Sequence, residues 1–266
     1  MPDTATRPDA DLVSVIIPVR NGVPFVGEAI ASALAQDHPA IEVLVVDDAS
    51  TDDTATWVHT RFGDRVRVLS RRDHAGPSAA RNHGIAAAQG VFLQFLDADD
   101  TLPPSKIARQ IDRLRREAAQ VAVATTIDAG SGAARRVREL PRSTAGRLRA
   151  SFLRGSFITT HAVLCRTDLV RAAGGFREDL RRCEDYELWL RLVDTGATFV
   201  MTPEVTVEYT RRADSLSADR RAMILANWRV LTDALRRRPP HDGAERRAAW
   251  LHRASLAVRF VMASLF

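Results

Sequence analysis

The sequence predicts an α/β fold in which helices flank a mostly parallel sheet, with a helical region appended at the C-terminus. Short β-branched runs alternate with segments whose apolar residues recur at helical spacing. The runs are mostly apolar, as in strands covered on both faces. The tail from Ala218 onward reads as two helices separated by Pro239-Pro240. Strands that alternate with helices favour parallel pairing through right-handed crossovers.

The first half of the chain alternates most clearly. Val13–Val19 (VSVIIPV) stops before the turn-forming pair Asn21-Gly22, and Pro24 suits the first position of the next helix. After the second strand, Ser50 with Asp53 three residues later predicts another helix start. The strands expected in this half are 13–19, 41–46, 66–69 and 91–96, with a helix over 77–88.

The second half is less regular. Residues 128–155 are rich in arginine and read as a mobile excursion. The elements expected around it are a helix with Ile107, Ile111 and Leu114 on one face, strands over 121–127 and 157–165, a short helix ended by Gly174-Gly175, and a helix from Glu184 to Val193.

The composition narrows the functional classes. The 266 residues are 45% hydrophobic, enough for one sizeable core, and the net charge of +5 rests on arginine because Lys106 is the only lysine. The arginine blocks are scattered and not interleaved with aromatic residues, so nucleic-acid binding is not expected. Cys165 and Cys183 do not make a disulfide framework, and neither a secretory signal nor an apolar stretch of membrane-spanning length is visible. We therefore expect a cytoplasmic protein.

Acidic residues follow two of the predicted strands. Asp47 and Asp48 come after the second strand, and Phe95–Asp100 (FLDADD) closes the fourth. These acids should meet at one edge, because ligands of parallel sheets bind beyond the carboxyl ends of the strands. Asp97 and Asp99 can face one site, where paired carboxylates suit Mg²⁺ or Mn²⁺ bound to a nucleoside diphosphate. Two such clusters are costly unless they bind something, and a base or ribose would pair with Asp48, although acids here could also simply cap helices.

A further acidic pair begins the helix in Cys183–Leu192 (CEDYELWLRL). Glu184 and Asp185 lie at its N-terminus, where the helix dipole would keep a carboxylate ionised and able to accept a proton, while weakening its basicity. The alternative is a capped amphipathic helix without a catalytic role.

Motifs of several other enzyme classes are absent. The histidines show no HExxH spacing, and the sequence has no GxSxG nucleophile elbow, no GxxxxGK[ST] phosphate loop and no GxGxxG after the first strand. Hydrolase, P-loop and ordinary dehydrogenase interpretations therefore lose support.

Six segments in order resemble glycosyltransferase family 2, whose members have the GT-A fold: VSVIIPVRNG, VLVVDDASTDDT, GPSAARNHGIAAAQG, FLDADD, GGF and EDYELWLRL. The resemblance spans about residues 12–216 and implies a nucleotide-binding half over 12–127 and an acceptor half over 156–216. A disordered segment over 1–11 would precede this domain, and a C-terminal helical region over 217–266 would follow it.

The resemblance implies an inverting transferase that moves one sugar from a nucleotide-sugar donor, with UDP as the default nucleotide, to a glycan, lipid-linked or small-molecule acceptor. Asp185 would be the general base, with Glu184 beside it in the catalytic site. Mg²⁺ or Mn²⁺ on Asp97 and Asp99 would neutralise the departing diphosphate. The residues implied to bind the donor nucleotide are Pro18, Val19, Arg20, Asn21, Asp48, Arg81, Asp97 and Ala98.

Two positions depart from the family pattern. Arg20 stands where a tyrosine that stacks on the base is common, and a guanidinium could stack there instead, which leaves GDP and dTDP open. Where many members have a histidine metal ligand, this sequence reads EYTRRADSLS, so either a third protein ligand is missing or Arg211 and Arg212 hold phosphate there. The QxxRW motif of processive synthases is missing, which favours transfer of a single sugar.

The arginines of the excursion suggest an anionic acceptor. The segment Ala244–Phe266 has apolar residues at helical spacing with arginines nearby; we expect it to pack on the core or on a second subunit, with peripheral membrane contact as the alternative. Two other functions stay open: a non-catalytic member that binds a nucleotide or glycan, and a nucleotidyltransferase of similar architecture.

Overall fold

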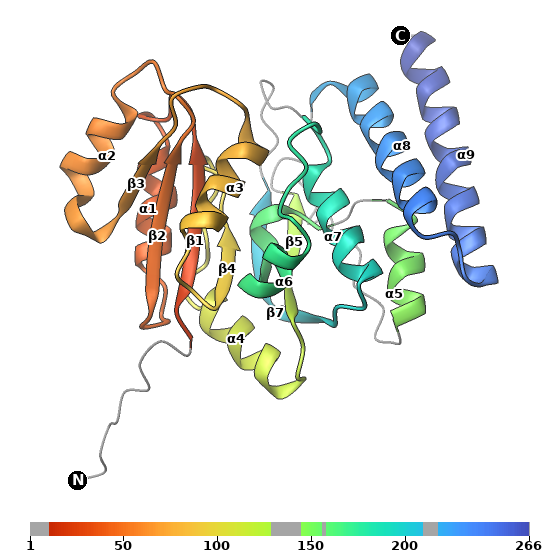
Figure 1. Ribbon diagram of the computed structural model, residues 1–266, viewed down its shortest axis with the longest axis horizontal. Helices are drawn as coiled ribbons and strands as arrows, with labels where there is room; N and C mark the ends of the chain where they lie inside the picture. Colours follow the sequence, from red (N-terminus) through yellow and green to blue (C-terminus); the bar gives the residue numbers. More distant parts are fainter. Residues whose placement is uncertain (1–10, 129–144, 156–157, 210–217, 266) are drawn as a thin grey trace.

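The computed structural model describes residues 11–128, 145–155, 158–209 and 218–265. Within them, one seven-stranded sheet has the spatial order β3 (Arg67–Ser70), β2 (Ile41–Asp47), β1 (Val13–Val19), β4 (Phe92–Phe95), β6 (Val163–Arg166), β5 (Val121–Asp128), β7 (Phe199–Tyr209) (Figure 1). β6 runs antiparallel to β4 and β5, whereas the other neighbouring strands pair in parallel. The mostly parallel α/β sheet expected from the sequence is confirmed.

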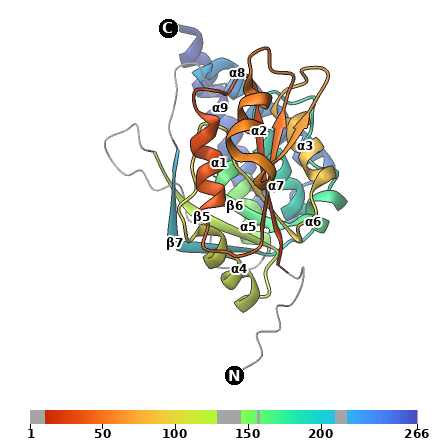
Figure 2. The same cartoon turned by 90° about the vertical axis from the view of Figure 1, so that its left-hand side faces the viewer.

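Helices form a layer on each face of the sheet. One layer contains α1 (Val26–Leu34), α2 (Thr54–Phe62) and α4 (Lys106–Arg116). The other contains α3 (Pro77–Ala87), α5 (Ala145–Phe152), α6 (Thr167–Ala172), α7 (Glu184–Asp194), α8 (Arg220–Arg237) and α9 (Gly243–Leu265). Two short 3-10 helices, η1 (Gly63–Arg65) and η3 (Thr160–Ala162), precede β3 and β6. In Figure 2 the end with α1 and α2 faces the viewer, and α8 and α9 lie at the far end.

The central strands are mostly apolar because each serves two cores. Successive side chains of a strand point to opposite faces of the sheet. In β1, Val15 and Ile17 therefore pack in the core under α1, α2 and α4, whereas Ile16 packs in the core on the side of α3 and α7. Gly84 lets α3 approach β1 closely, since a Cβ there would lie 2.5 Å from Ile16 Cγ2.

Two predicted helix starts are wrong, each for a local reason. The first helix begins at Val26 rather than Pro24, because the amides of Phe25 and Val26 donate to the Gly22 carbonyl in a preceding turn. Ser50 does not begin α2: its hydroxyl donates to Asp47. The residue before α2 is instead Asp53.

The late strand is shorter than predicted and runs in the opposite direction to its neighbours. The expectation of a strand over 157–165 is confirmed only from Val163, because η3 occupies Thr160–Ala162 and residues 156–157 lie outside the described part. The other predicted strands and helices are confirmed within a few residues at their ends.

The C-terminal helices are an integral part of the second layer. Ile224 of α8 and Leu256 of α9 lie in the same core as α7, so this region packs on the domain as expected. The apolar face that predicted this packing is not the one that makes it, because Trp250, Val258 and Val261 are exposed. Arg149 of α5 is fully buried and donates to Asp194 of α7 (2.6 Å) and to Glu245 of α9 (2.6 Å). Such a buried network is stable only while its partners are complete. None of the helices in the described part combines the length and hydrophobicity that a membrane crossing requires.

Candidate active site

The acids after β2 and β4 lie at the carboxyl edge of the sheet, as predicted, but internal donors engage several of them. Asp47 accepts from the amide and hydroxyl of Ser50. Asp100 pairs with His161, with 3.0 Å between Oδ2 and Nδ1. Because these bonds stabilise carboxylates without any ligand, the expectation that both clusters must bind something applies to fewer acids than the sequence suggested.

The loop after β1 is fastened to the loop after β2. Asn21 has a left-handed backbone (φ 53°), and its Oδ1 accepts from the Thr51 amide (2.8 Å). The Asn21 amide in turn donates to the Ser50 hydroxyl (2.9 Å). These bonds fix the end of β1 and the start of the loop after it, where three implied donor residues lie: Pro18, partly buried; Val19, buried; and Arg20, exposed.

Asp48 anchors the loop between β3 and α3. Its buried carboxylate contacts His74 Nδ1 (2.7 Å) and accepts from the amides of Gly76 (2.7 Å) and Ala75 (3.2 Å). Arg71 Nε lies 3.0 Å from the same carboxylate. The structure therefore gives Asp48 a role in holding this loop, and its pairing with a base or ribose stays a prediction.

Arg81 connects the donor edge with the start of α7. From α3 its buried guanidinium donates to Asp97 Oδ1 (2.6 Å) and to Glu184 Oε1 (2.8 Å). It also lies over the Phe176 ring, with Cζ 5.3 Å from the centroid, in cation–π geometry. Burial alone would lower the pKa of Arg81, but the two carboxylates raise it, so the positive charge is fixed. Four of the quoted motifs thus meet at one side chain.

Asp97 and Asp99 occupy the turn after β4, where both are accessible to solvent; 36% of the Asp97 side chain is exposed. Burial would raise the pKa of Asp97, but the Arg81 guanidinium outweighs it and holds the pKa below its ordinary value. The described residues contain no group of three or more acidic, histidine or cysteine side chains able to hold a metal. Two accessible carboxylates nevertheless fit Mg²⁺ or Mn²⁺, whose other ligands are usually water and phosphate oxygens.

The pKa of Asp185 is shifted in the opposite direction to that of Asp97. Burial, followed by the charge of Glu184, raises the pKa of Asp185 to about 7, although the Tyr186 amide (2.6 Å) and Arg81 oppose the shift. The expectation that the helix dipole would keep Asp185 ionised and weaken its basicity is therefore wrong, because its pKa is raised. A carboxyl that titrates near neutral pH is well matched to general-base catalysis.

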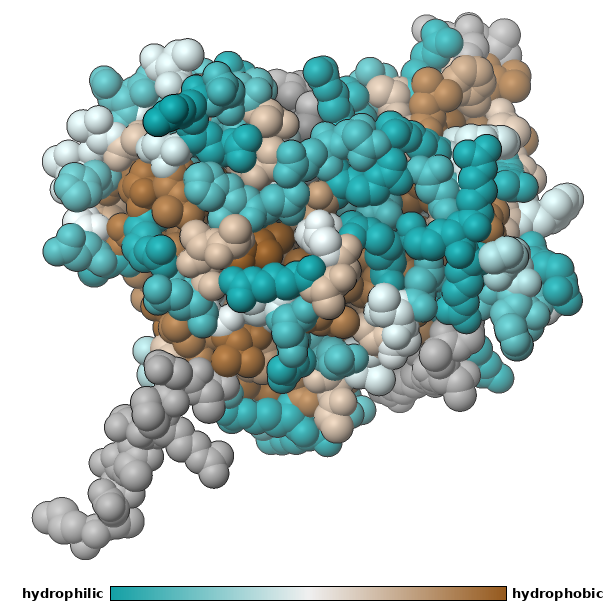
Figure 3. All heavy atoms as spheres, in the orientation of Figure 1, coloured by the Kyte–Doolittle hydropathy of each residue, from teal (hydrophilic) through white to brown (hydrophobic). Residues whose placement is uncertain are grey.

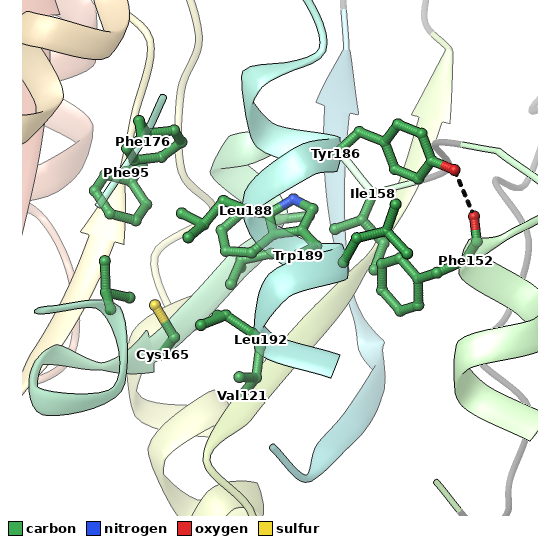
Figure 4. Packing of buried hydrophobic residues seen from close by; sticks show 14 of the residues in the cluster. Phe95, Val121, Phe152, Ile158, Cys165, Phe176, Tyr186, Leu188, Trp189 and Leu192 are labelled. Atoms are coloured by element: carbon green, nitrogen blue, oxygen red, sulfur yellow. Dashed lines mark hydrogen bonds between the residues drawn. The ribbon is translucent and has the colours of Figure 1, made fainter. Parts of the chain in front are cut away.

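Asn82 and Phe176 belong to the site, although sequence reasoning gave them no role. Asn82 accepts from the Phe176 amide (2.8 Å) and donates to its carbonyl (2.8 Å), which clamps the segment before α7 to α3. The Phe176 ring packs edge-on against Phe95 (5.0 Å between centroids) and Trp189 (6.5 Å), as Figure 4 shows. Both residues lie in quoted motifs, but nothing in the sequence shows that GPSAARNHG and GGF touch.

The remaining site predictions fall into two groups. Ala98 is buried in the turn between Asp97 and Asp99. Arg211 and Arg212, expected near phosphate, lie outside the described residues, as do residues 129–144 of the arginine-rich excursion and residues 1–10 of the segment expected to be disordered over 1–11. The expectation of a mobile excursion is wrong for its end, because Ala145–Phe152 forms α5 and Arg149 in it is fully buried.

The model of glycosyl transferase family 2 matches residues 14–174, more than half of the chain. The chain belongs to glycosyltransferase family 2. The match extends from β1 past the end of α6 and includes Arg81, Asp97 and Asp99, whereas Asp185 lies beyond it.

This glycosyltransferase family 2 chain is 33% identical over 219 residues to the succinoglycan biosynthesis protein ExoO of Rhizobium meliloti (strain 1021), covering 77% of this chain and 62% of ExoO. It is 29% identical over 246 residues to ExoU, a succinoglycan biosynthesis protein of the same strain, covering 84% of this chain and 72% of ExoU. The chain thus spans about three fifths of ExoO, and likewise 60% of an uncharacterized glycosyltransferase of Rickettsia typhi.

Two solved structures share the fold of this glycosyltransferase family 2 chain. Staphylococcus aureus TarS 1-349 in complex with UDP-GlcNAc has a TM-score of 0.72 at 21% identity, covering 93% of this chain and 72% of TarS 1-349. The mannosyltransferase PcManGT from Pyrobaculum calidifontis, in complex with GDP-Man and Mn²⁺, has a TM-score of 0.72 at 21% identity, covering 100% and 75%. The expected GT-A fold is confirmed.

Proposed function

We propose that this chain is an inverting glycosyltransferase that moves one sugar from a nucleotide-sugar donor to an acceptor hydroxyl. The observation that carries the proposal is the double contact of Arg81 with Asp97 and Glu184. It links the accessible carboxylates after β4 to Asp185, whose pKa is raised to about 7. A protein that only binds a nucleotide or glycan has no need of such a base.

The donor nucleotide binds, in this proposal, at the carboxyl ends of β1, β2 and β4. Arg20 is exposed there and can stack on the base. Only 4% of the Arg81 side chain is exposed, and its Nη1 and Nη2 atoms are each bonded to a carboxylate. Arg81 is therefore a positioning residue rather than a contact to the donor. Asp97 and Asp99 would hold Mg²⁺ or Mn²⁺, which supplies neutralisation of the departing diphosphate when it is bound.

Asp185 accepts the proton of the acceptor hydroxyl as that oxygen attacks the anomeric carbon. The bond between the anomeric carbon and the diphosphate oxygen breaks, its electron pair leaves with the diphosphate, and the sugar configuration inverts. Glu184 supports this step because its charge contributes to the raised pKa of Asp185.

The comparisons support donors and acceptors of particular kinds. TarS is in complex with UDP-GlcNAc and PcManGT with GDP-Man, so UDP and GDP sugars are the first donors to test. ExoO and ExoU are named for succinoglycan biosynthesis, which supports a growing or lipid-linked glycan as acceptor.

Calorimetric titration with UDP, GDP and dTDP, each with Mn²⁺ or with chelator, tests the donor site. One nucleotide should bind with Mn²⁺ and at least about tenfold more weakly with chelator. Asp99→Ala should lose this binding, whereas Asp53→Ala, an exposed acid at the start of α2, should keep it. Failure of the folded wild type to bind any nucleotide would contradict the proposal and favour a non-catalytic role.

A further inference from the structure

The outward side of α9 is an exposed apolar surface. In the part of the chain that the structure describes, the exposed large hydrophobic side chains all lie on α8 and α9: Leu225, Trp228, Trp250, Leu251, Val258, Val261 and Met262. Figure 3 shows apolar surface gathered at the projecting end of α9. Large hydrophobic side chains that are exposed together on one pair of helices are typical of an interaction surface.

The exposed and packed sides of α9 are opposite each other. Successive residues turn by about 100° around a helix, so Trp250 and Val261 project away from the side that carries the buried residues His252 and Leu256. Beyond Leu256 the helix is covered less, since Ala257, Val258 and Arg259 are exposed in succession. The apolar side chains here are therefore not part of the domain core.

The exposed charges on this helix are all positive. Its exposed charged residues are Arg246, Arg247, Arg253 and Arg259. Its one carboxylate, Glu245, is buried and bonded to Arg149. A second copy docked through the same surface would bring arginines together without carboxylates from α9 to pair with them. Charge complementarity therefore favours an anionic partner.

A hollow beside the apolar surface suits a phosphate group. It has a volume of about 250 Å³ and is lined by Arg154, Arg247, Leu251, His252 and Ser255. Arg154 follows α5 and Arg247 lies on α9, and both are exposed. Two guanidinium groups next to an exposed leucine match a lipid phosphate whose acyl chains lie against the apolar side of the helix.

We propose that α9 binds the surface of a membrane that contains anionic phospholipids. Trp250, Val258 and Val261 enter the boundary between headgroups and acyl chains, and the arginines contact the phosphates. Tryptophan and arginine suit this boundary because each combines an apolar body with a polar end. α9 runs toward the end of the molecule where the parallel strands finish (Figure 1). Membrane binding through α9 does not depend on the proposed function.

Co-sedimentation with vesicles tests the proposal. The wild type should bind vesicles of equal parts phosphatidylglycerol and phosphatidylcholine at least about tenfold more tightly than phosphatidylcholine alone, and added salt should weaken this binding. Val258→Gln/Val261→Gln/Met262→Gln and Arg247→Gln/Arg253→Gln should each weaken it about tenfold or more. The matched control Arg115→Gln/Arg116→Gln removes two exposed arginines of α4 and should bind like the wild type.

The outcomes distinguish lipid binding from self-association. All substituted residues are exposed, and circular dichroism and thermal melting would verify that each variant folds. Failure of the wild type to bind anionic vesicles, or binding that the α9 variants leave unchanged, would overturn the proposal. A dimer in analytical ultracentrifugation that the Val258→Gln/Val261→Gln/Met262→Gln variant disrupts, without vesicle binding, would make this surface an interface between copies. Nucleotide calorimetry on the same variants would show separately whether the donor site functions.

Discussion

Asp97 in the turn after β4 and Asp185 at the start of α7 both lie near the Arg81 guanidinium, but their pKa values shift in opposite directions. Asp97 bonds directly to Arg81 Nη2 at 2.6 Å, and its pKa is lowered. Arg81 acts on Asp185 only through its charge, which lowers the pKa, while burial and Glu184 raise that pKa to about 7. At Asp97 the charge and the hydrogen bond of Arg81 together outweigh burial, whereas at Asp185 burial and the charge of Glu184 outweigh Arg81.

This difference matches a division of chemical roles. A carboxylate that stays ionised across the neutral range suits a cation or a donor, whereas one that titrates near pH 7 can take and return a proton. Pairs of acids whose environments push their pKa values apart are a recurring way to assign such roles. The following substitutions are designed to remove or sharpen the contrast between Asp97 and Asp185.

The largest expected effect is on turnover. Asp185→Asn should lower kcat by about 10² to 10⁴, because the acceptor hydroxyl loses its base, while nucleotide affinity changes little. Asp97→Asn should instead weaken nucleotide binding in the presence of Mn²⁺. Steady-state kinetics and calorimetry on both variants distinguish the two roles, and near-normal turnover by Asp185→Asn would show that the base is another residue.

Arg81→Met removes the charge that the two regions share. We expect the free energy of unfolding to fall by about 2–3 kcal/mol, below the usual range for a fully buried pair because Asp97 is a third exposed. Arg116→Met is the control, since its pair with Asp112 is on the surface and should contribute less than about 1 kcal/mol. Denaturant unfolding measures both, and equal stability of the two variants would mean that Arg81 does not organise the site.

Stability should depend on pH through Asp185. Its carboxyl is neutral in the folded protein up to about pH 7 but ionises near pH 4 when unfolded, so the unfolded state binds fewer protons between these values. This group therefore stabilises the fold fully below pH 4, and its contribution falls by about 1.4 kcal/mol per pH unit as the pH rises to 7. The difference in unfolding free energy between wild type and Asp185→Asn should show this slope. A difference that is constant with pH would contradict the raised pKa.

The smallest expected effect comes from Glu184→Gln. Loss of its charge should lower the pKa of Asp185, so the rise of kcat/KM with pH should move to lower pH. Glu178→Gln is a matched control, because Glu178 is exposed and bonds to Asn82. An unchanged pH profile in Glu184→Gln would show that the two acids of α7 are not coupled.

Much of the fold could be predicted because the residue pattern of a strand reflects whether its two faces are buried. The run Val13–Val19 is apolar at every position but Ser14 since both of its faces are covered, and that pattern is visible in the sequence. The reversed direction of β6 could not be predicted, because an apolar run reads the same whichever way it pairs. Ser50 looked like a helix cap, but its hydroxyl is bonded to Asp47, a competition that local sequence does not resolve.

The site was predicted as a set of motifs and not as a set of contacts. Arg81 was assigned to the donor, yet it bonds to Glu184, 103 positions away in the chain. Asn82 and Phe176 were missed because their contact joins separate motifs. The basicity of Asp185 depends on burial and on Glu184, whereas the sequence showed only its place at a helix N-terminus.

The most direct test is a ¹³C NMR titration of protein labelled at the aspartate carboxyl carbons, which requires no knowledge of the donor or acceptor. We expect one carboxyl to titrate near pH 7, to persist in Asp97→Asn and to vanish in Asp185→Asn. Aspartates that all titrate near or below their ordinary value of about 4 would contradict the assignment of Asp185 as a base poised for neutral pH.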